Sequence, residues 1–283
     1  MKPTAFAYLA PESGDEALAA LAEHGEEAAV LAGGQSLIPM MNLRIAAPGT
    51  LIDIMRIDEL RTIRRTGGWV EIGAGVRMSQ AERESGVPLL TAALRHVGHP
   101  PIRNCGTLCG SVAHADPAAE VPAVLLALDG EVVLRSVRGE RTIPADDFLR
   151  SYFTTAREPD ELVAAIRLPD RARRVAFLEV TPRLGGSTGE FATIALAAAA
   201  DRDGAGRFER VSLAYAGAAE RAIRAREAEA LLAGAEPAPE LFAAAAAAAS
   251  AAVDPSADVH AGPEYRRHLV EKLTLRALEE LAA

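Results

Sequence analysis

The first sixty residues alternate between short apolar runs and polar or glycine-rich segments. Charged residues follow Ser13 and the apolar spacing stops at Gly25, which predicts a capped helix between them. Apolar runs of strand length follow on both sides of a glycine-rich loop. A strand–loop–helix–strand order of this kind predicts a small α/β unit. The predicted helices cover 15–24 and begin at Pro39, and the predicted strands cover 28–31 and 50–54.

From Leu60 onward the pattern changes to alternation of apolar and polar residues. Two runs that flank Gly67-Gly68 predict a hairpin, and two further runs predict a second hairpin through Gly139. A longer apolar strand is expected to end at Pro169, because proline lacks the backbone N–H that donates hydrogen bonds between strands. The predicted strands are 61–65, 69–73, 131–137, 140–143 and 162–168, and the predicted helices are 79–84, 89–97 and 118–128.

The polar and basic residues 170–174 predict a boundary, after which three strand-like and three helical patterns follow. We therefore expect an α+β fold in three parts, comprising residues 1–56, 57–170 and 171–283. The expected strands of the last part are 176–181, 190–200 and 210–216, and its expected helices are 221–232, 241–252 and 265–282.

Composition excludes several classes of protein. The chain has 283 residues, a net charge of −9 and a pI near 5.3, without the dense Lys/Arg run typical of nucleic-acid binders. The longest apolar run, Leu241 to Val253, is short for a membrane span. Two cysteines provide no disulfide framework, and no apolar signal segment follows the first residues. We expect a cytoplasmic protein that binds neither nucleic acid nor membrane.

Two glycine-rich segments carry the candidate chemistry. The first is Ala32-Gly33-Gly34-Gln35-Ser36, and the second runs from Arg103 to Ser111. We expect each to follow a strand and to expose backbone N–H groups, which bind phosphate where no Cβ obstructs the approach. Two such loops suit a nucleotide cofactor with two phosphates. Gln35 and Ser36 add side-chain donors, and Ser36 is also expected to cap the next helix. The alternative is an ordinary β–α turn.

Polar residues around the second segment leave several roles open. Thr107 offers a hydroxyl, and His114 is an acid, a base, a metal ligand or a hydrogen-bonded turn residue. Asp116 is expected to cap a helix with Pro117 at its first position. Glu120 is expected either to accept a hydrogen bond from a ribityl or ribose hydroxyl, or to lie on a solvated first turn.

Other common motifs are missing from the sequence. Gly73-Ala74-Gly75 lacks the third glycine of a dinucleotide-binding fingerprint, because Met78 takes its place. Neither a Walker A lysine nor a nucleophile-elbow serine is present. Cys105 and Cys109 are too few for a zinc or iron–sulfur site, so no metal site is predicted.

The segment from Ala32 to Pro39 resembles the first flavin motif of the FAD-binding medium subunit of molybdenum hydroxylases, a family that includes carbon monoxide dehydrogenase and xanthine dehydrogenase. Thr107 to Ser111 falls where the family has Thr-Ile-Gly-Gly-Asn, and the continuation from Ala113 to Pro117 also matches. The resemblance covers essentially the whole chain. It implies a PCMH-type (vanillyl-alcohol-oxidase-like) FAD domain of two α/β subdomains, followed by a medium-subunit-like C-terminal α+β domain.

The resemblance also implies roles for individual residues. The two motifs would hold the FAD diphosphate, Ile102 would lie along the isoalloxazine or its linker, and Val163 would pack near the ring. Glu120 stands where the family has an aspartate near the ribityl chain. Cys109 replaces a glycine, Ser111 an asparagine, and Glu179 a lysine near the flavin. The expected cofactor-binding residues are Ala32, Gly33, Gly34, Gln35, Ser36, Ile102, Thr107, Leu108, Cys109, Gly110, Ser111, Glu120, Val163 and Glu179.

The resemblance implies an oxidoreductase subunit, in which electrons from a partner's iron–sulfur clusters reach the flavin and pass to an acceptor. Its expected partners are iron–sulfur and molybdopterin subunits. The departures at Cys109, Ser111 and Glu179 motivate an alternative, a stand-alone cyclase or isomerase of specialised metabolism with structural or absent FAD and a small-molecule substrate. A carboxylate at Glu179 would oppose an anionic reduced flavin. A non-catalytic scaffold subunit is the third hypothesis.

Overall fold

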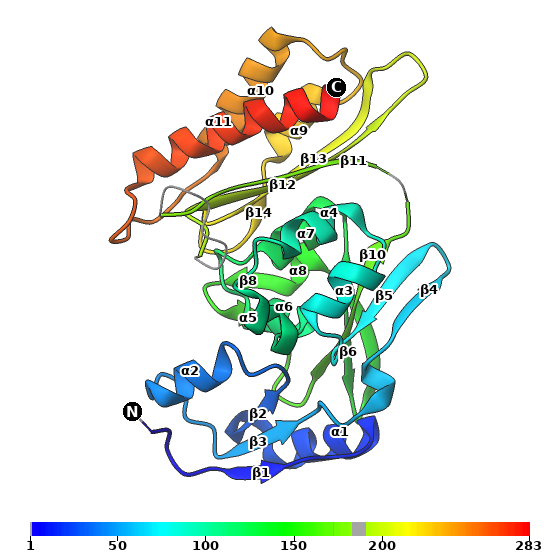
Figure 1. The fold of residues 1–283 in the computed structure, drawn as a ribbon, viewed down its shortest axis with the longest axis vertical. Helices are drawn as coiled ribbons and strands as arrows, with labels where there is room; N and C mark the ends of the chain where they lie inside the picture. Colours follow the sequence, from blue (N-terminus) through cyan, green and yellow to red (C-terminus); the bar gives the residue numbers. More distant parts are fainter. Residues whose placement is uncertain (1, 172, 183–190) are drawn as a thin grey trace.

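The computed structural model describes residues 2–171, 173–182 and 191–283. Within these ranges the strands form sheets of three, five and four strands and one two-stranded ribbon. The three larger sheets follow one another along the long axis of the molecule, with the N-terminus at one end and helices α9–α11 at the other (Figure 1). This mixture of parallel, antiparallel and helical parts is the α+β organisation predicted from the sequence.

The N-terminal sheet is parallel, with strand order β1-β3-β2. Parallel strands end at the same edge, so the segment after β2 lies beside the end of β3. The predicted cap of α1 is confirmed, because Ser13 Oγ accepts a hydrogen bond from Glu16 N at 3.2 Å and Gly25 ends the helix. The elements are β1 (Ala7–Leu9), α1 (Gly14–His24), η1 (Gly25–Glu27), β2 (Ala28–Leu31), α2 (Leu37–Asn42), β3 (Thr50–Asp53) and η2 (Asp58–Leu60).

The middle sheet is antiparallel, with strand order β4-β5-β10-β6-β7, and it contains both predicted hairpins. The eight residues of α7 are all buried, since the helix is packed from several sides. The elements are β4 (Ile63–Thr66), β5 (Trp69–Gly73), α3 (Met78–Glu84), α4 (Pro88–Leu94), α5 (Pro100–Cys105), α6 (Leu108–His114), α7 (Glu120–Ala127), β6 (Glu131–Ser136), β7 (Gly139–Pro144), α8 (Ala145–Phe148), β8 (Leu149–Ser151), β9 (Thr154–Thr155) and β10 (Leu162–Pro169).

The C-terminal sheet is antiparallel, with strand order β11-β12-β13-β14. Helices α9–α11 cover one face, and α4 and α7 pack on the other (Figure 1). Alternate residues of β12 therefore enter two different cores, with Ala197 in the first and Leu196 in the second. The elements are β11 (Arg174–Val180), β12 (Ile194–Arg202), β13 (Phe208–Ala216), β14 (Ile223–Arg224), α9 (Arg226–Leu232), α10 (Pro239–Ala252) and α11 (Pro263–Ala282).

Three local predictions were wrong. The second glycine-rich segment begins within helix α5 rather than after a strand, and Leu108 to Ser111 already belong to helix α6. The helix expected from residue 118 begins at Glu120, so Asp116 does not cap it; Asp116 Oδ1 accepts a hydrogen bond from Ala118 N in a local turn at 2.9 Å. The helix expected from residue 221 is preceded by β14, which pairs with the edge of the sheet.

No helix in the described ranges is long and apolar enough to cross a membrane. The divisions at residues 56 and 170 stay predictions. By comparison with the family motif, the sequence from Leu184 to Thr188 looks like a short insertion; it lies outside the described residues.

Candidate functional site

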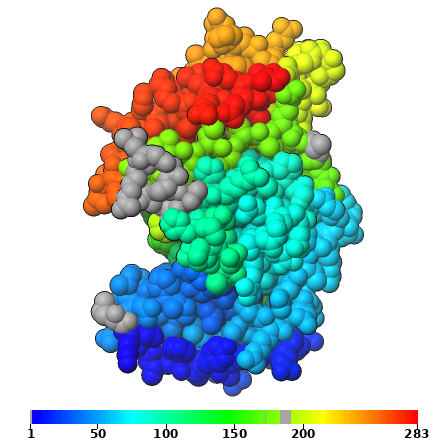
Figure 2. Space-filling model, viewed as in Figure 1, coloured from blue at the N-terminus to red at the C-terminus, as the bar shows by residue number. Residues whose placement is uncertain are grey.

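A cleft of about 540 Å³ opens between the N-terminal sheet and the middle of the chain. Figure 2 shows the hollow between the N-terminal residues and the segment that carries α6. Both glycine-rich segments border it, although more than sixty residues separate them in the sequence. Its size is in the range of sites that bury a small molecule or cofactor. The cleft is therefore the candidate site.

Gly33 has no room for a side chain because the two glycine-rich segments touch there. A Cβ on Gly33 would lie 2.3 Å from the carbonyl oxygen of Cys105 and 2.5 Å from the Cα of Gly106. Gly34 has a φ of +70°, a conformation that glycine adopts at little cost. The glycines therefore serve the contact and the turn between the segments, and they leave backbone exposed to the cleft.

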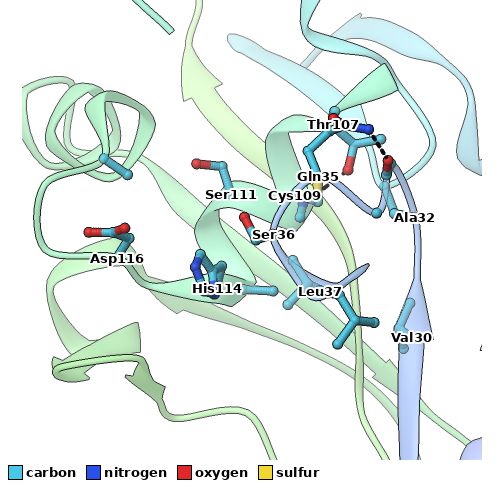
Figure 3. Close-up of a pocket in the computed structure, with 18 of the residues that line it drawn as sticks. Val30, Ala32, Gln35, Ser36, Leu37, Thr107, Cys109, Ser111, His114 and Asp116 are labelled. Atoms are coloured by element: carbon cyan, nitrogen blue, oxygen red, sulfur yellow. Dashed lines mark hydrogen bonds between the residues drawn. The ribbon is translucent and has the colours of Figure 1, made fainter. Parts of the chain in front are cut away.

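Two polar side chains follow the glycines of the first segment. Gln35 Nε2 donates a hydrogen bond to the carbonyl oxygen of Gly33 at 2.9 Å, which fixes the loop (Figure 3). Ser36 precedes α2 but its side chain makes no capping hydrogen bond, so the predicted helix cap is wrong. Its hydroxyl borders the cleft instead.

Thr107 organises the second segment as a helix cap. Its Oγ1 accepts a hydrogen bond from Gly110 N at 3.1 Å, and a Cβ on Gly110 would lie 2.8 Å from that oxygen. Leu108 is fully buried in the core, so its side chain does not border the cleft. Ser111 follows on α6 and faces the cleft with Thr107 and Gly110 (Figure 3).

The Cys109 side chain is directed into the protein. Its Sγ lies 3.6 Å from the carbonyl oxygen of Ile72, and burial raises the pKa of the thiol to about 12. The thiol therefore stays protonated and unreactive near neutral pH. Cys109 lines the cleft, but the residue is 2 % exposed and its sulfur contacts the carbonyl oxygen of Ile72, so a cysteine in place of glycine is compatible with the cleft.

Apolar side chains also line the cleft. Ile102, on α5, and Val163, on β10, both border it. His114 lies at the end of α6 with its ring 5.0 Å from that of Phe153, and burial lowers the pKa of the imidazole. The cleft thus combines glycine backbone and polar groups with apolar side chains.

Glu120 and Glu179 differ in position. Glu120 begins α7, borders the cleft and is 7 % exposed, so the solvated alternative is wrong. Burial raises its pKa to about 7. Glu179 lies on β11 and does not border the cleft; burial, then the charge of Glu120, raises its pKa to about 8. Of the fourteen predicted residues, Leu108 and Glu179 are the two whose side chains do not border the cleft.

Sequence reasoning did not predict several residues that border the cleft, among them Arg157, Glu161 and Phe191. Arg157 Nη1 donates hydrogen bonds to the carbonyl oxygens of Glu158, Pro159 and Glu161. The run of charged residues before β10 is typical of a solvated loop, and no local signal distinguishes Arg157 within it. Glu161 forms a bidentate ion pair with Arg141.

The two raised carboxyl pKa values predict that the free energy of unfolding falls with rising pH. The folded chain binds these protons more tightly than the unfolded chain, whose carboxyls have ordinary pKa values near 4.5. The stabilisation is complete below pH about 4.5 and is lost as the pH rises through about 7 and 8. We expect a loss of about 4 kcal/mol between pH about 6 and 9, measured by urea unfolding.

The substitution Glu179→Gln should flatten that profile, because it removes a titrating group that is buried. Glu140→Gln, at an exposed hairpin position, is the matched control and should leave the profile unchanged. Parallel pH profiles for the natural chain and the Glu179→Gln variant would contradict the prediction.

Comparison with known proteins agrees with this architecture. Residues 4–171 match a family model described as the FAD binding domain in molybdopterin dehydrogenase, and residues 183–281 match the CO dehydrogenase flavoprotein C-terminal domain. The chain is 37 % identical to the alpha subunit of the 6-hydroxypseudooxynicotine dehydrogenase complex of Paenarthrobacter nicotinovorans, covering 98 % of this chain and 95 % of that subunit. It is 36 % identical to the glyceraldehyde dehydrogenase medium chain of Sulfolobus acidocaldarius, covering 100 % of both.

The solved structures lead to the same assignment. A chain of the carbon monoxide dehydrogenase from Hydrogenophaga pseudoflava superimposes with a TM-score of 0.95 at 37 % identity, covering 99 % of this chain and 98 % of that one. Sequence and fold therefore match over the whole length. The chain belongs to the family of FAD-binding medium subunits of the molybdenum hydroxylases, whose cofactor is FAD.

Proposed function

We propose that this chain holds FAD in the cleft and passes electrons from iron–sulfur clusters of a partner subunit through the flavin to an acceptor, in the cytoplasm. The observation that carries the proposal is the contact of the two glycine-rich segments at Gly33 and Cys105, which exposes backbone from both to one cleft. When bound, FAD supplies the redox chemistry, and the protein positions it and sets its surroundings.

The residues present fit FAD. The cleft offers backbone without a Cβ, together with the hydroxyls of Ser36 and Ser111, which suits an anionic diphosphate. It also offers Ile102 and Val163, which suit a flat and largely apolar ring system. Arg157 contributes the positive charge of its guanidinium to the same cleft.

Each group has a proposed task toward the cofactor. The backbone of 32–36 and 106–111 binds the diphosphate, and Thr107 holds the second segment in shape through its hydrogen bond to Gly110. Glu120 is placed to meet a ribityl hydroxyl. The apolar side chains orient the ring and exclude water from it. Leu108 takes part through its backbone, and Glu179 acts from behind the cleft.

The relatives support a chain that works within a complex. They are named as a complex subunit and a medium chain, and they match this chain over nearly its whole length. The stand-alone cyclase or isomerase is not favoured, because Cys109, one of its motivating departures, packs into the core without disturbing the cleft. We therefore propose iron–sulfur and molybdopterin subunits as partners.

The test is to isolate the tagged chain from its native cells and to measure FAD, iron, acid-labile sulfide and molybdenum in the purified material. We expect FAD in a 1:1 ratio with the chain, together with iron, sulfide and molybdenum on co-purifying subunits. A chain that purifies without these metals and converts a small molecule without net redox change would contradict the proposal and support the stand-alone alternative.

A further inference from the structure

An acidic side chain is buried where the C-terminal sheet packs on the middle of the chain. Along β11, Val175 and Phe177 pack against the core that contains α4 and α7, whereas Leu178 and Val180 pack against the core beneath α9–α11. Alternation along a strand places Glu179 on the side of Val175 and Phe177. Glu179 therefore points from the C-terminal sheet toward the helices behind the cleft.

Within the part of the chain that the structure describes, no cation or hydrogen-bond donor close to Glu179 explains its burial. Its side chain is 3 % exposed, and among the described residues its Oε2 has no hydrogen-bond partner. The Nδ1 of His96 lies 3.9 Å from that oxygen, which is too far for a hydrogen bond, and burial lowers the pKa of His96. A lone buried carboxylate is costly, so its surroundings favour the protonated form.

The titratable groups that face Glu179 are few. From α7 the carboxyl of Glu120 acts on it, and just beyond α4 the imidazole of His96 approaches it. On β12 the residue opposite is Ala195, which carries no charge. No arginine or lysine in the described ranges forms an ion pair with Glu179. The like charge of Glu120 is therefore not offset.

Glu120 links this buried group to the cleft. It borders the cleft while being almost fully buried, and the nearby charge of Asp116 also disfavours its ionised form. With pKa values raised to about 7 and about 8, Glu120 and Glu179 together retain about one proton near neutral pH. We refer to these two residues as the carboxyl pair.

We propose that the carboxyl pair is a proton-binding site coupled to the cleft, so that binding of FAD is accompanied by uptake of a proton from solution. This inference rests on the proposed function, because it takes FAD as the occupant. The bound cofactor excludes water from Glu120 and adds the negative charge of its diphosphate. Both effects favour a protonated carboxyl, so a carboxylate oxygen gains one proton from the buffer as FAD binds. FAD affinity then falls as the pH rises, by up to about tenfold per pH unit.

The test is calorimetric titration of the FAD-free full chain with FAD at pH about 7.5, between the two pKa values, in buffers of different ionisation enthalpy. The dependence of the heat on the buffer gives the number of protons taken up. We expect uptake of about half a proton by the natural chain, and a smaller uptake by Glu120→Gln and by Glu179→Gln, because each variant removes one of the two titrating groups. Glu140→Gln, remote from the cleft, should match the natural chain.

The outcomes separate this inference from the proposed function. Tight FAD binding by the natural chain without dependence on buffer, or unchanged uptake in Glu179→Gln, overturns the inference and leaves the FAD site standing. Absence of any FAD binding to the natural chain overturns both. Buffer dependence is measured on the natural chain alone. The proposal can therefore be overturned even if the variants fail to fold.

Discussion

The substitution Gly33→Val should lower FAD affinity by at least about 100-fold. A valine Cβ would lie 2.3 Å from the carbonyl oxygen of Cys105, so the two glycine-rich segments must separate. The obstacle is backbone, which does not move aside as a flexible side chain does. Because both segments contribute backbone donors to one cleft, their separation removes donors from the diphosphate. A loss of about 2.7 kcal/mol of binding free energy corresponds to that factor.

The measurement is the FAD content of the purified variant by visible absorbance, followed by titration with added FAD. Gly204→Val is the matched control, since a Cβ at Gly204 meets nothing within 4 Å and its φ is not in the left-handed region. Its FAD content should equal that of the natural chain. Stoichiometric FAD in a well-folded Gly33→Val variant would contradict this description of the site.

The substitution Arg224→Met should destabilise the chain by about 3 kcal/mol. The Arg224 guanidinium donates two hydrogen bonds to the Glu229 carboxylate, at 2.8 and 2.7 Å, and one to Asp129 at 2.5 Å. Arg224 and Glu229 are each 9 % exposed at the side chain. Loss of the arginine leaves a buried carboxylate without its cation, and it removes the connection from β14 to the turn that follows α7.

Urea unfolding gives the change in free energy. Arg226→Met is the matched control, because the Arg226 side chain is 61 % exposed and its ion pair with Asp146 lies at the surface. Arg226→Met should lower the free energy of unfolding by less than about 1 kcal/mol. Equal costs for the two variants would show that the buried pair contributes no more than the exposed one. The double variant Arg224→Met/Glu229→Gln should recover part of the loss, since it also removes the stranded charge.

Much of the fold was predictable because local patterns agree with it. Gly67-Gly68 produced the expected hairpin, and Pro169 ends β10 as expected. The prediction was wrong where prolines begin a helix. Pro100 and Pro101 open α5, which the sequence did not reveal, because proline is a helix breaker everywhere except in the first turn. For this reason a strand, and not a helix, was predicted before the second glycine-rich segment.

The candidate site was predictable where a few contiguous residues form it. Both glycine-rich segments are visible in the sequence and predict a nucleotide cofactor, and the resemblance identified that cofactor as FAD. The approach of His96 to Glu179 had no signal, because more than eighty residues separate them and only the packing of β11 on α4 brings them together. The reason for glycine at position 33 was also hidden, since it depends on the backbone of Cys105.

The most direct test of the central claim is the visible absorption spectrum of the purified full chain during titration with FAD and then with a reductant. The account predicts saturation at one FAD per chain, a flavin spectrum perturbed from that of free FAD, and bleaching on reduction. A chain that stays colourless, or whose flavin spectrum remains that of free FAD throughout the titration, would contradict the claim that the cleft between the two glycine-rich segments holds the cofactor.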